Sequence, residues 1–268
     1  MRLFENHPDL SVTSYTFQDA FCSGPEPLSR RNNAPFIAKK GGKKPDATYQ
    51  NSFNRLQKFI ADAEAVGKIP FIKEHLTYIT DPQVVAANII CLPNGTPRIV
   101  NLRPTINDST SVPTESMPLL ANPTLLPTRF LKTVSPAILI RHPGKIVPSF
   151  YRASRNTIVT TVFDEEFPVE ASLRWPRLIF DWYEEYYRIA GIKQRPLVID
   201  AEDIINDSYN VIEKFCAMTG LDPKYIQYSW EESNDECDPV RAAFHSTLRN
   251  STGIIRGDQV NILQVALR

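Results

Sequence analysis

The sequence predicts an α/β protein in which a parallel sheet carries helices on both faces, in three layers. Two observations support this prediction. Short apolar runs are typical of buried strands, and longer amphipathic stretches alternate with them along the chain. Buried parallel strands are almost wholly apolar, whereas half-exposed strands alternate. At 268 residues the chain is long enough for one domain with a sizeable core, which we expect to span residues 1–268.

The first helix–strand unit is expected between residues 49 and 75. Apolar side chains recur at helical spacing in 49–66, and Gly67 is positioned to end that helix. Residues 71–75 follow as a strand. Lys73 and His75 therefore lie near the carboxyl end of a strand, which is where open α/β sheets bind their ligands. A histidine after an apolar strand is also often a satisfied structural residue, and this alternative stays open.

A long proline-rich segment follows. Residues 93–136 hold eight prolines and show little apolar periodicity, so we expect an ordered loop or a lid inserted into the domain. It could cover a substrate pocket or be a tolerated insertion.

The next strand is expected at 137–140, with a turn imposed by Pro143 and a helix beyond it. Arg141 then lies at the strand end and Ser149 on the first turns of the helix. An arginine and a hydroxyl so placed can hold a phosphate from two sides. An ordinary strand–turn–helix junction with a surface arginine is the alternative.

The carboxyl-terminal part is expected to form a helix over 172–190, a strand over 197–199 and a helix over 209–219, followed by an irregular tail at 254–268. The tryptophans and tyrosines of 172–190 repeat at helical spacing, which is typical of a core-facing stripe.

Together these segments resemble the sulfotransferases that use 3′-phosphoadenosine-5′-phosphosulfate (PAPS), and in particular a fungal branch of sulfotransferase-like P-loop proteins. The resemblance rests on Lys-x-His at 73–75, Leu-Leu-Pro at 125–127, Arg141 with Ser149, and the 196–221 segment, and it covers roughly residues 45–235. It implies that His75 takes the proton of the acceptor hydroxyl and that Lys73 stabilises the leaving phosphate. It also implies that Arg141 and Ser149 bind the 3′-phosphate of PAPS or of its product PAP.

The chain departs from this family in three places. Ala201 stands where the family has a tyrosine, and the 249–259 segment matches the family's last nucleotide-binding motif only in residue types. The family's glycine- and serine-rich phosphosulfate loop has no counterpart, because Lys39–Lys44 follows no strong strand and suits a solvated basic loop. Residues 1–8 read like the tail of the helix that follows such a loop. We therefore expect the sheet to lack its first strand, an exposed edge or gap beside the 137–140 strand, and no appreciable PAPS-dependent turnover by the 268-residue chain alone.

The composition of the chain limits the classes of partner that we expect for it. Lys plus Arg and Asp plus Glu number 30 each, so no overall charge favours nucleic acid or membranes. The four cysteines form no Cys-x-x-Cys pair, which argues against a zinc site and a disulfide framework. We expect no metal and a cytoplasmic protein without a membrane span. The oligomeric state is left open.

Three functions follow from these expectations. The first is sulfuryl transfer from PAPS to a small-molecule hydroxyl or amine, in the setting of fungal secondary metabolism. The second is a degenerate, non-catalytic nucleotide-binding or scaffold protein, and the third is a repurposed accessory protein of small-molecule biosynthesis.

Overall fold

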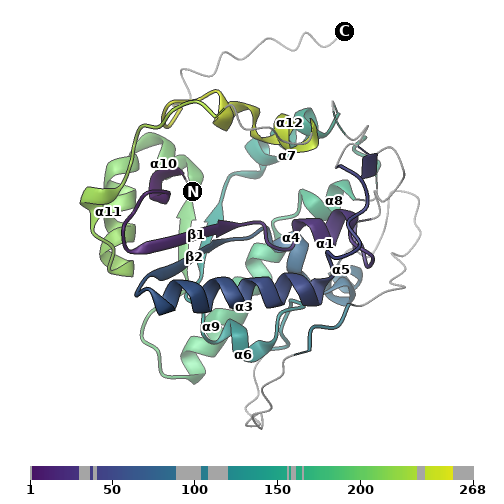
Figure 1. Cartoon of the computed structure of the whole chain (residues 1–268), viewed down its shortest axis with the longest axis horizontal. Coiled ribbons are helices and arrows are strands. Elements are labelled where there is room, and N and C mark those ends of the chain that lie inside the picture. The colour runs from purple at the N-terminus through teal and green to yellow at the C-terminus, as the bar shows by residue number, and fades with distance from the viewer. Residues whose placement is uncertain are drawn as a thin grey trace.

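A computed structural model describes residues 2–29, 37–38, 41–88, 104–107, 120–155, 157, 161–164, 166–233 and 239–255. Helices surround a small number of short central strands (Figure 1). The elements of the amino-terminal half are η1 (Arg2–Phe4), β1 (Leu10–Ser14), α1 (Gln18–Ser23), α3 (Tyr49–Ala65), β2 (Ile69–Lys73), α4 (Leu76–Ile79), α5 (Pro82–Asn88) and α6 (Thr128–Leu131). Those that follow are β3 (Ala137–Ile140), α7 (Pro143–Arg155), α8 (Phe167–Glu170), α9 (Arg174–Ile189), β4 (Leu197–Asp200), α10 (Ala201–Asn206), α11 (Ser208–Thr219), η2 (Pro223–Tyr225) and α12 (Pro239–Arg249).

The strands pair in parallel, as expected, but the described residues do not form one continuous sheet. β1 pairs with β2 and β3 pairs with β4, which gives two separate two-stranded sheets. This architecture is compatible with the α/β class, whereas a single three-layer sheet is not seen in the described part of the chain. Leu139 of β3 keeps 59% of its surface exposed, which is unusual for the middle of a parallel strand.

Apolar side chains leave the strands on both sides and enter two different clusters. Ile72 of β2 and Ile138 of β3 join a cluster with α3 and α9. The neighbouring Phe71 of β2 joins a second cluster with α11, to which Leu197 of β4 also belongs. Because successive strand residues point to opposite faces, this division places α3 and α9 on one side of the strands and α11 on the other.

Most of the predicted elements are confirmed with small shifts at their ends. The helix predicted at 49–66 is α3, and Gly67 after it has a φ of +70°, as a helix-ending glycine should. The strand predicted at 71–75 lies two residues earlier, so His75 stands just beyond β2 as the amino-terminal cap of α4. The helices predicted at 172–190 and 209–219 are α9 and α11.

Two regions differ from the prediction. Residues 1–8 do not form the end of a long helix: the described part is a single 3-10 turn, followed by β1, which the sequence reading missed. The proline-rich segment 93–136 is not loop throughout, because α6 lies within it and Leu131 is buried in the core. Most of 93–119, and the tail beyond residue 255, lie outside the described residues.

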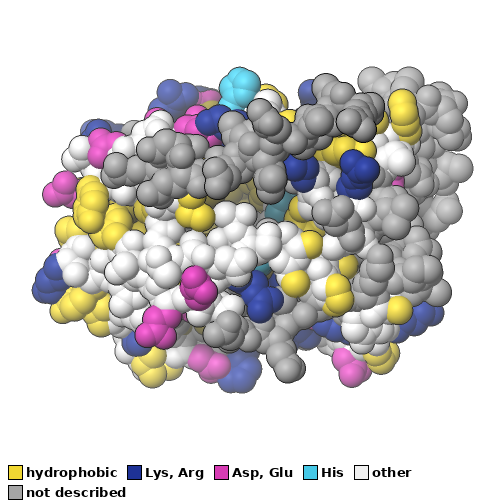
Figure 2. Space-filling model, turned by 90° about the horizontal axis from the view of Figure 1, so that it is seen from above, with side chains coloured by type: hydrophobic (Ala, Val, Ile, Leu, Met, Phe, Trp, Pro, Cys, Tyr) yellow, Lys and Arg dark blue, Asp and Glu magenta, His cyan; other side chains and the backbone are white. Residues whose placement is uncertain are grey.

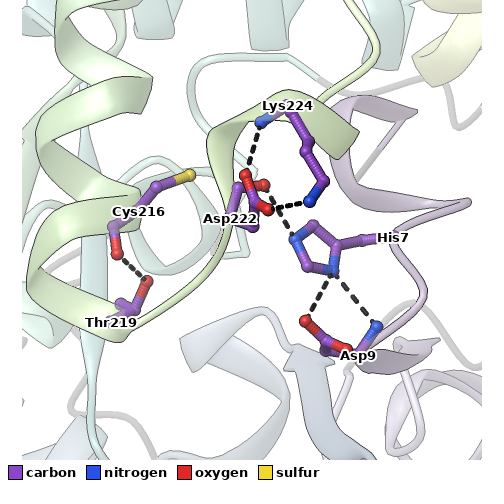
Figure 3. Close-up of polar contacts among 6 residues, drawn as sticks. All are labelled: His7, Asp9, Cys216, Thr219, Asp222 and Lys224. Atoms are coloured by element: carbon purple, nitrogen blue, oxygen red, sulfur yellow. Dashed lines mark hydrogen bonds and ion pairs between the residues drawn. The ribbon is translucent and has the colours of Figure 1, made fainter.

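A buried histidine ties the amino-terminal turn to the turn after α11 (Figure 3). The His7 side chain is fully buried, and its Nδ1 accepts a hydrogen bond from the Asp9 amide at 3.2 Å. The other ring nitrogen, Nε2, therefore carries the proton and donates it to the Asp222 carbonyl at 3.2 Å. Both nitrogens are satisfied, which identifies His7 as a structural residue.

Replacing His7 by alanine is expected to lower the free energy of unfolding by about 1–3 kcal/mol, because it removes a buried side chain and leaves two partly buried backbone groups, the Asp9 amide and the Asp222 carbonyl, without their partner. Chemical denaturation of the variant and the wild type measures the difference. Asn6→Ala, which removes an exposed hydrogen bond to Gln227, serves as the control and should change stability by less than about 0.5 kcal/mol. Equal stability of His7→Ala and the wild type would contradict the structural role.

No helix in the described residues is both long enough and apolar enough to span a membrane.

Candidate functional site

Lys73 and His75 are brought together where two parallel strands end. Ser14 is paired with Lys73 at the last position of the β1–β2 sheet, and the Tyr15 amide donates to the Lys73 carbonyl at 2.8 Å. Carboxyl ends of parallel strands share one edge, so the turn after β1 and the Lys-x-His segment after β2 are neighbours. This edge is the first part of the candidate site.

Aromatic rings surround this edge. The Lys73 ammonium lies 4.6 Å from the centroid of the Tyr15 ring, a cation–π distance. The Tyr78 ring lies 5.1 Å from the His75 ring and 6.2 Å from the Tyr15 ring. The ring of His245, on α12, lies 6.1 Å from that of Tyr15. Figure 2, which views the molecule from above, shows histidine atoms partly covered by other side chains, with Lys and Arg side chains nearby on the same face.

The His75 imidazole is held in its neutral form. Partial removal from water, with a smaller contribution from the nearby Lys73 ammonium, lowers its pKa to about 4. The side chain still reaches solvent. At neutral pH it therefore presents an unprotonated nitrogen to an approaching molecule, which a general base requires.

Glu74, between these two residues, has the opposite shift. Burial raises its pKa to about 7, although the hydrogen bonds from backbone groups and the nearby Lys73 charge act in the other direction. The sequence reading assigned no role to Glu74.

Arg141 and Ser149 form a second group at the end of β3. Arg141 directly follows the strand, and Ser149 lies in the second turn of α7, as predicted. Among the described residues the Ser149 hydroxyl makes no hydrogen bond. The Arg141 guanidinium donates to Glu202 of α10 at 3.2 Å, and Lys145 pairs with the other oxygen of the same carboxylate. These hydrogen bonds, Lys145 first, lower the pKa of Glu202.

Helix α12 contacts both groups. Its Phe244 ring lies 5.8 Å from that of Phe150 on α7, next to Ser149, while the adjacent His245 faces Tyr15. Figure 1 shows α12 beside α7, and their contacts confirm that arrangement. Helix α12 thus contacts both the turn after β1 and the middle of α7.

Three aromatic residues of the site were not predicted from the sequence. Tyr15 was missed because β1 was missed, although Leu10 and Val12 alternate with polar residues as in a half-buried strand. Tyr78 and His245 have no local signal, because only the packing of α4 and α12 brings them to the site. Lys44 of the basic segment pairs with Asp19 at 2.8 Å. In the described part of the chain no group of three or more His, Cys, Asp or Glu is arranged to hold a metal ion.

Lys73 and His75 thus lie together at the end of β2, and Arg141 lies at the end of β3 in the other two-stranded sheet. The chain is 29% identical over 218 residues to sulfotransferase ppzF of Metarhizium majus (strain ARSEF 297), and 27% identical over 218 residues to sulfotransferase ppzF of Metarhizium rileyi (strain RCEF 4871). These similarities support a sulfotransferase-like family.

The matched region covers 77% of this chain and 62% of each relative, so the chain spans about three fifths of the length of the curated proteins it matches. No family model matches the sequence. No solved structure matches it either.

Proposed function

We propose that the protein is a transferase that moves a sulfuryl group from PAPS to a hydroxyl or amine of a small molecule. The observation that carries the proposal is the placement of Lys73 and neutral His75 together at the carboxyl end of β2. The similarity to two fungal sulfotransferases supports it.

In this proposal His75 accepts the proton of the acceptor hydroxyl as its oxygen forms a bond to sulfur. The bond between sulfur and the bridging oxygen of the donor breaks, and the electron pair remains on that oxygen. The Lys73 ammonium stabilises the negative charge that develops there. Both groups are needed, because an alcohol is a weak nucleophile and the leaving phosphate carries growing charge.

The residues at the end of β3 suit the 3′-phosphate of the same donor. Arg141 supplies a planar guanidinium, Lys145 a second cation and Ser149 a hydroxyl that has no hydrogen-bond partner among the described residues. Glu202 accepts from both cations. A bound phosphate therefore has to replace or share these contacts.

Glu202 also favours a second candidate function. Its single carboxylate pairs with both Arg141 and Lys145 and so offsets one of their two positive charges, which suits a protein that retains the scaffold without the transfer reaction. Calorimetric titration with PAP tests whether this protein still binds nucleotide, and transfer of labelled sulfate from PAPS to small-molecule acceptors tests for the enzyme. Nucleotide binding without transfer would favour the non-catalytic candidate.

Replacing Arg141 by alanine is expected to weaken PAP binding about 10- to 100-fold, because it removes a charge-assisted contact worth about 1.5–3 kcal/mol. Calorimetry with both proteins measures the change. Arg188→Ala removes an exposed arginine of α9 that pairs with Glu185, and it should leave the affinity unchanged. Equal affinity of the wild type and Arg141→Ala would contradict the assignment of the 3′-phosphate site.

A further inference from the structure

The Glu74 carboxylate joins two segments that are distant in sequence. Its Oε2 accepts a hydrogen bond from the Phe17 amide at 3.1 Å, and its Oε1 accepts one from the His75 amide at 2.8 Å. Phe17 is the cap residue of α1 and His75 the cap residue of α4, and neither helix has a capping hydrogen bond from its own cap side chain. One carboxylate therefore holds the start of both helices.

The segment held in this way carries a strained residue. Tyr15 has a φ of +56°, the left-handed region that side-chain-bearing residues rarely adopt. Such a conformation persists only where the surroundings determine it, and it is common at functional sites. Here the Tyr15 amide is bound to the Lys73 carbonyl, and the carboxylate of Glu74 holds the chain two residues further on.

Tyr15 is also the residue whose ring lies against the Lys73 ammonium. The position of that ring depends on the backbone of the turn, and the turn depends on its attachment to the end of β2. Lys73, the turn and His75 are thus connected through Glu74.

Resting on the proposed function, we propose that Glu74 is a positioning residue. Its carboxylate fixes the Tyr15–Phe17 turn against the end of β2 and so sets the Lys73 ammonium and the His75 ring in their relative places. Glu74 does not itself touch the reacting groups.

The protonation state of Glu74 affects the hydrogen bonds that attach it to the Phe17 and His75 amides. With a pKa of about 7, both of its forms are populated near neutral pH. The charged and titratable groups around it are Lys73 and His75 on either side, and Tyr49 from α3. Protonation turns one carboxylate oxygen from an acceptor into an O–H donor. Because removal from water outweighs the hydrogen bonds and raises the pKa, the buried position of Glu74 is favoured below about pH 7 and costs more free energy as the pH rises.

The test is Glu74→Gln, which keeps the shape of the side chain but turns an NH₂ group toward one of the two amides. In the variant, the Phe17 amide should exchange its hydrogen about tenfold faster, as expected for the loss of one hydrogen bond. Amides in the middle of α9 should exchange at the wild-type rate. Glu64→Gln, on the exposed side of α3, is the matched control. It should change neither the exchange rate of the Phe17 amide nor the exchange rates of the α9 amides.

A second measurement separates positioning from simple stabilisation. Protons above an aromatic ring resonate upfield, so the ε-methylene protons of Lys73 should be shifted by the Tyr15 ring in the wild type. Tyr15→Leu gives the reference without the ring. In Glu74→Gln the Lys73 signal should move at least halfway to that reference. An unchanged Lys73 signal would overturn the positioning role, and an unchanged Phe17 exchange rate would overturn the attachment itself.

Both measurements are independent of catalysis. In the transfer assay, Glu74→Gln should lower kcat about tenfold or more while KM for the acceptor stays within about twofold. Absence of transfer by the wild type would count against the proposed function, and the two nuclear magnetic resonance measurements would still decide the role of Glu74.

Discussion

Where sulfuryl transfer from PAPS is measured, with this chain or with a form that carries the phosphosulfate loop, replacing His75 by alanine is expected to reduce its rate about 10²–10⁴-fold, the usual contribution of a general base. The imidazole is neutral at pH 7 because its pKa is lowered to about 4, so nearly every molecule has the base in its active form. The measurement is the initial rate of labelled-sulfate transfer from PAPS with saturating acceptor.

Added imidazole is the sharpest control for this prediction. A small imidazole can enter the space left in His75→Ala and accept the proton, so it should restore part of the rate in the variant and none in the wild type. A loss of less than tenfold, or a large loss that imidazole does not reverse, would contradict the role of His75 as the base.

Replacing Trp182 by alanine is expected to lower the free energy of unfolding by about 3–5 kcal/mol. Trp182 of α9 is completely buried in the largest apolar cluster, and its ring lies 4.8 Å from that of Tyr183 and 5.6 Å from that of Tyr186. Alanine would leave a cavity at a point where several elements meet. Urea denaturation monitored by circular dichroism gives the change.

The two buried tryptophans of α9 provide a matched comparison. The Trp182 indole N–H finds no partner among the described residues, whereas that of Trp175 donates to the Val169 carbonyl at 2.7 Å. Trp182→Phe should therefore cost less stability than Trp175→Phe, which loses a made hydrogen bond. If the free energy of unfolding of Trp182→Ala lay within about 1 kcal/mol of the wild-type value, the central place of this residue in the core would be contradicted.

The amphipathic helices and the apolar strands were predictable because their signal is local. α3 and α9 bury one face each, and the apolar residues of those faces recur at helical spacing in the sequence. β3 and β4 are short apolar runs bounded by turns. β1 was missed because Leu10–Ser14 is half polar and only five residues long, so its pattern is weak without its partner β2.

The proline-rich segment shows how packing overrides composition. Its eight prolines suggested a loop, yet Leu125, Leu126 and Leu131 join the core, and Thr124 bridges to Thr80. Burial of these leucines orders the chain where local propensity favours none.

The site was predictable only in part. Lys73, His75, Arg141 and Ser149 were predicted because they lie at or after apolar strands in segments that resemble a known family. In the structure Lys73 ends β2, His75 and Arg141 closely follow β2 and β3, and Ser149 lies in α7. Their convergence on one donor molecule stays a prediction. The ion pair of Glu202 with Arg141 has no local sequence signal and arises because β3 and β4 are adjacent.

The sequence was sufficient to predict β2, β3 and β4, the helices α3, α7, α9 and α11, the parallel pairing of strands, and the basic and imidazole side chains near the strand ends, but not β1 or the shorter helices. These properties depend on residue periodicity and on turn-forming residues within short windows. Only the tertiary structure decided that Tyr15, Tyr78 and His245 surround Lys73 and His75, and that Glu74 joins the turn after β1 to the end of β2. Apart from the Tyr78–His75 contact, these contacts join residues that are distant in sequence, 57 positions in the case of Phe17 and Glu74. Their formation depends on the packing of whole elements rather than on a local pattern.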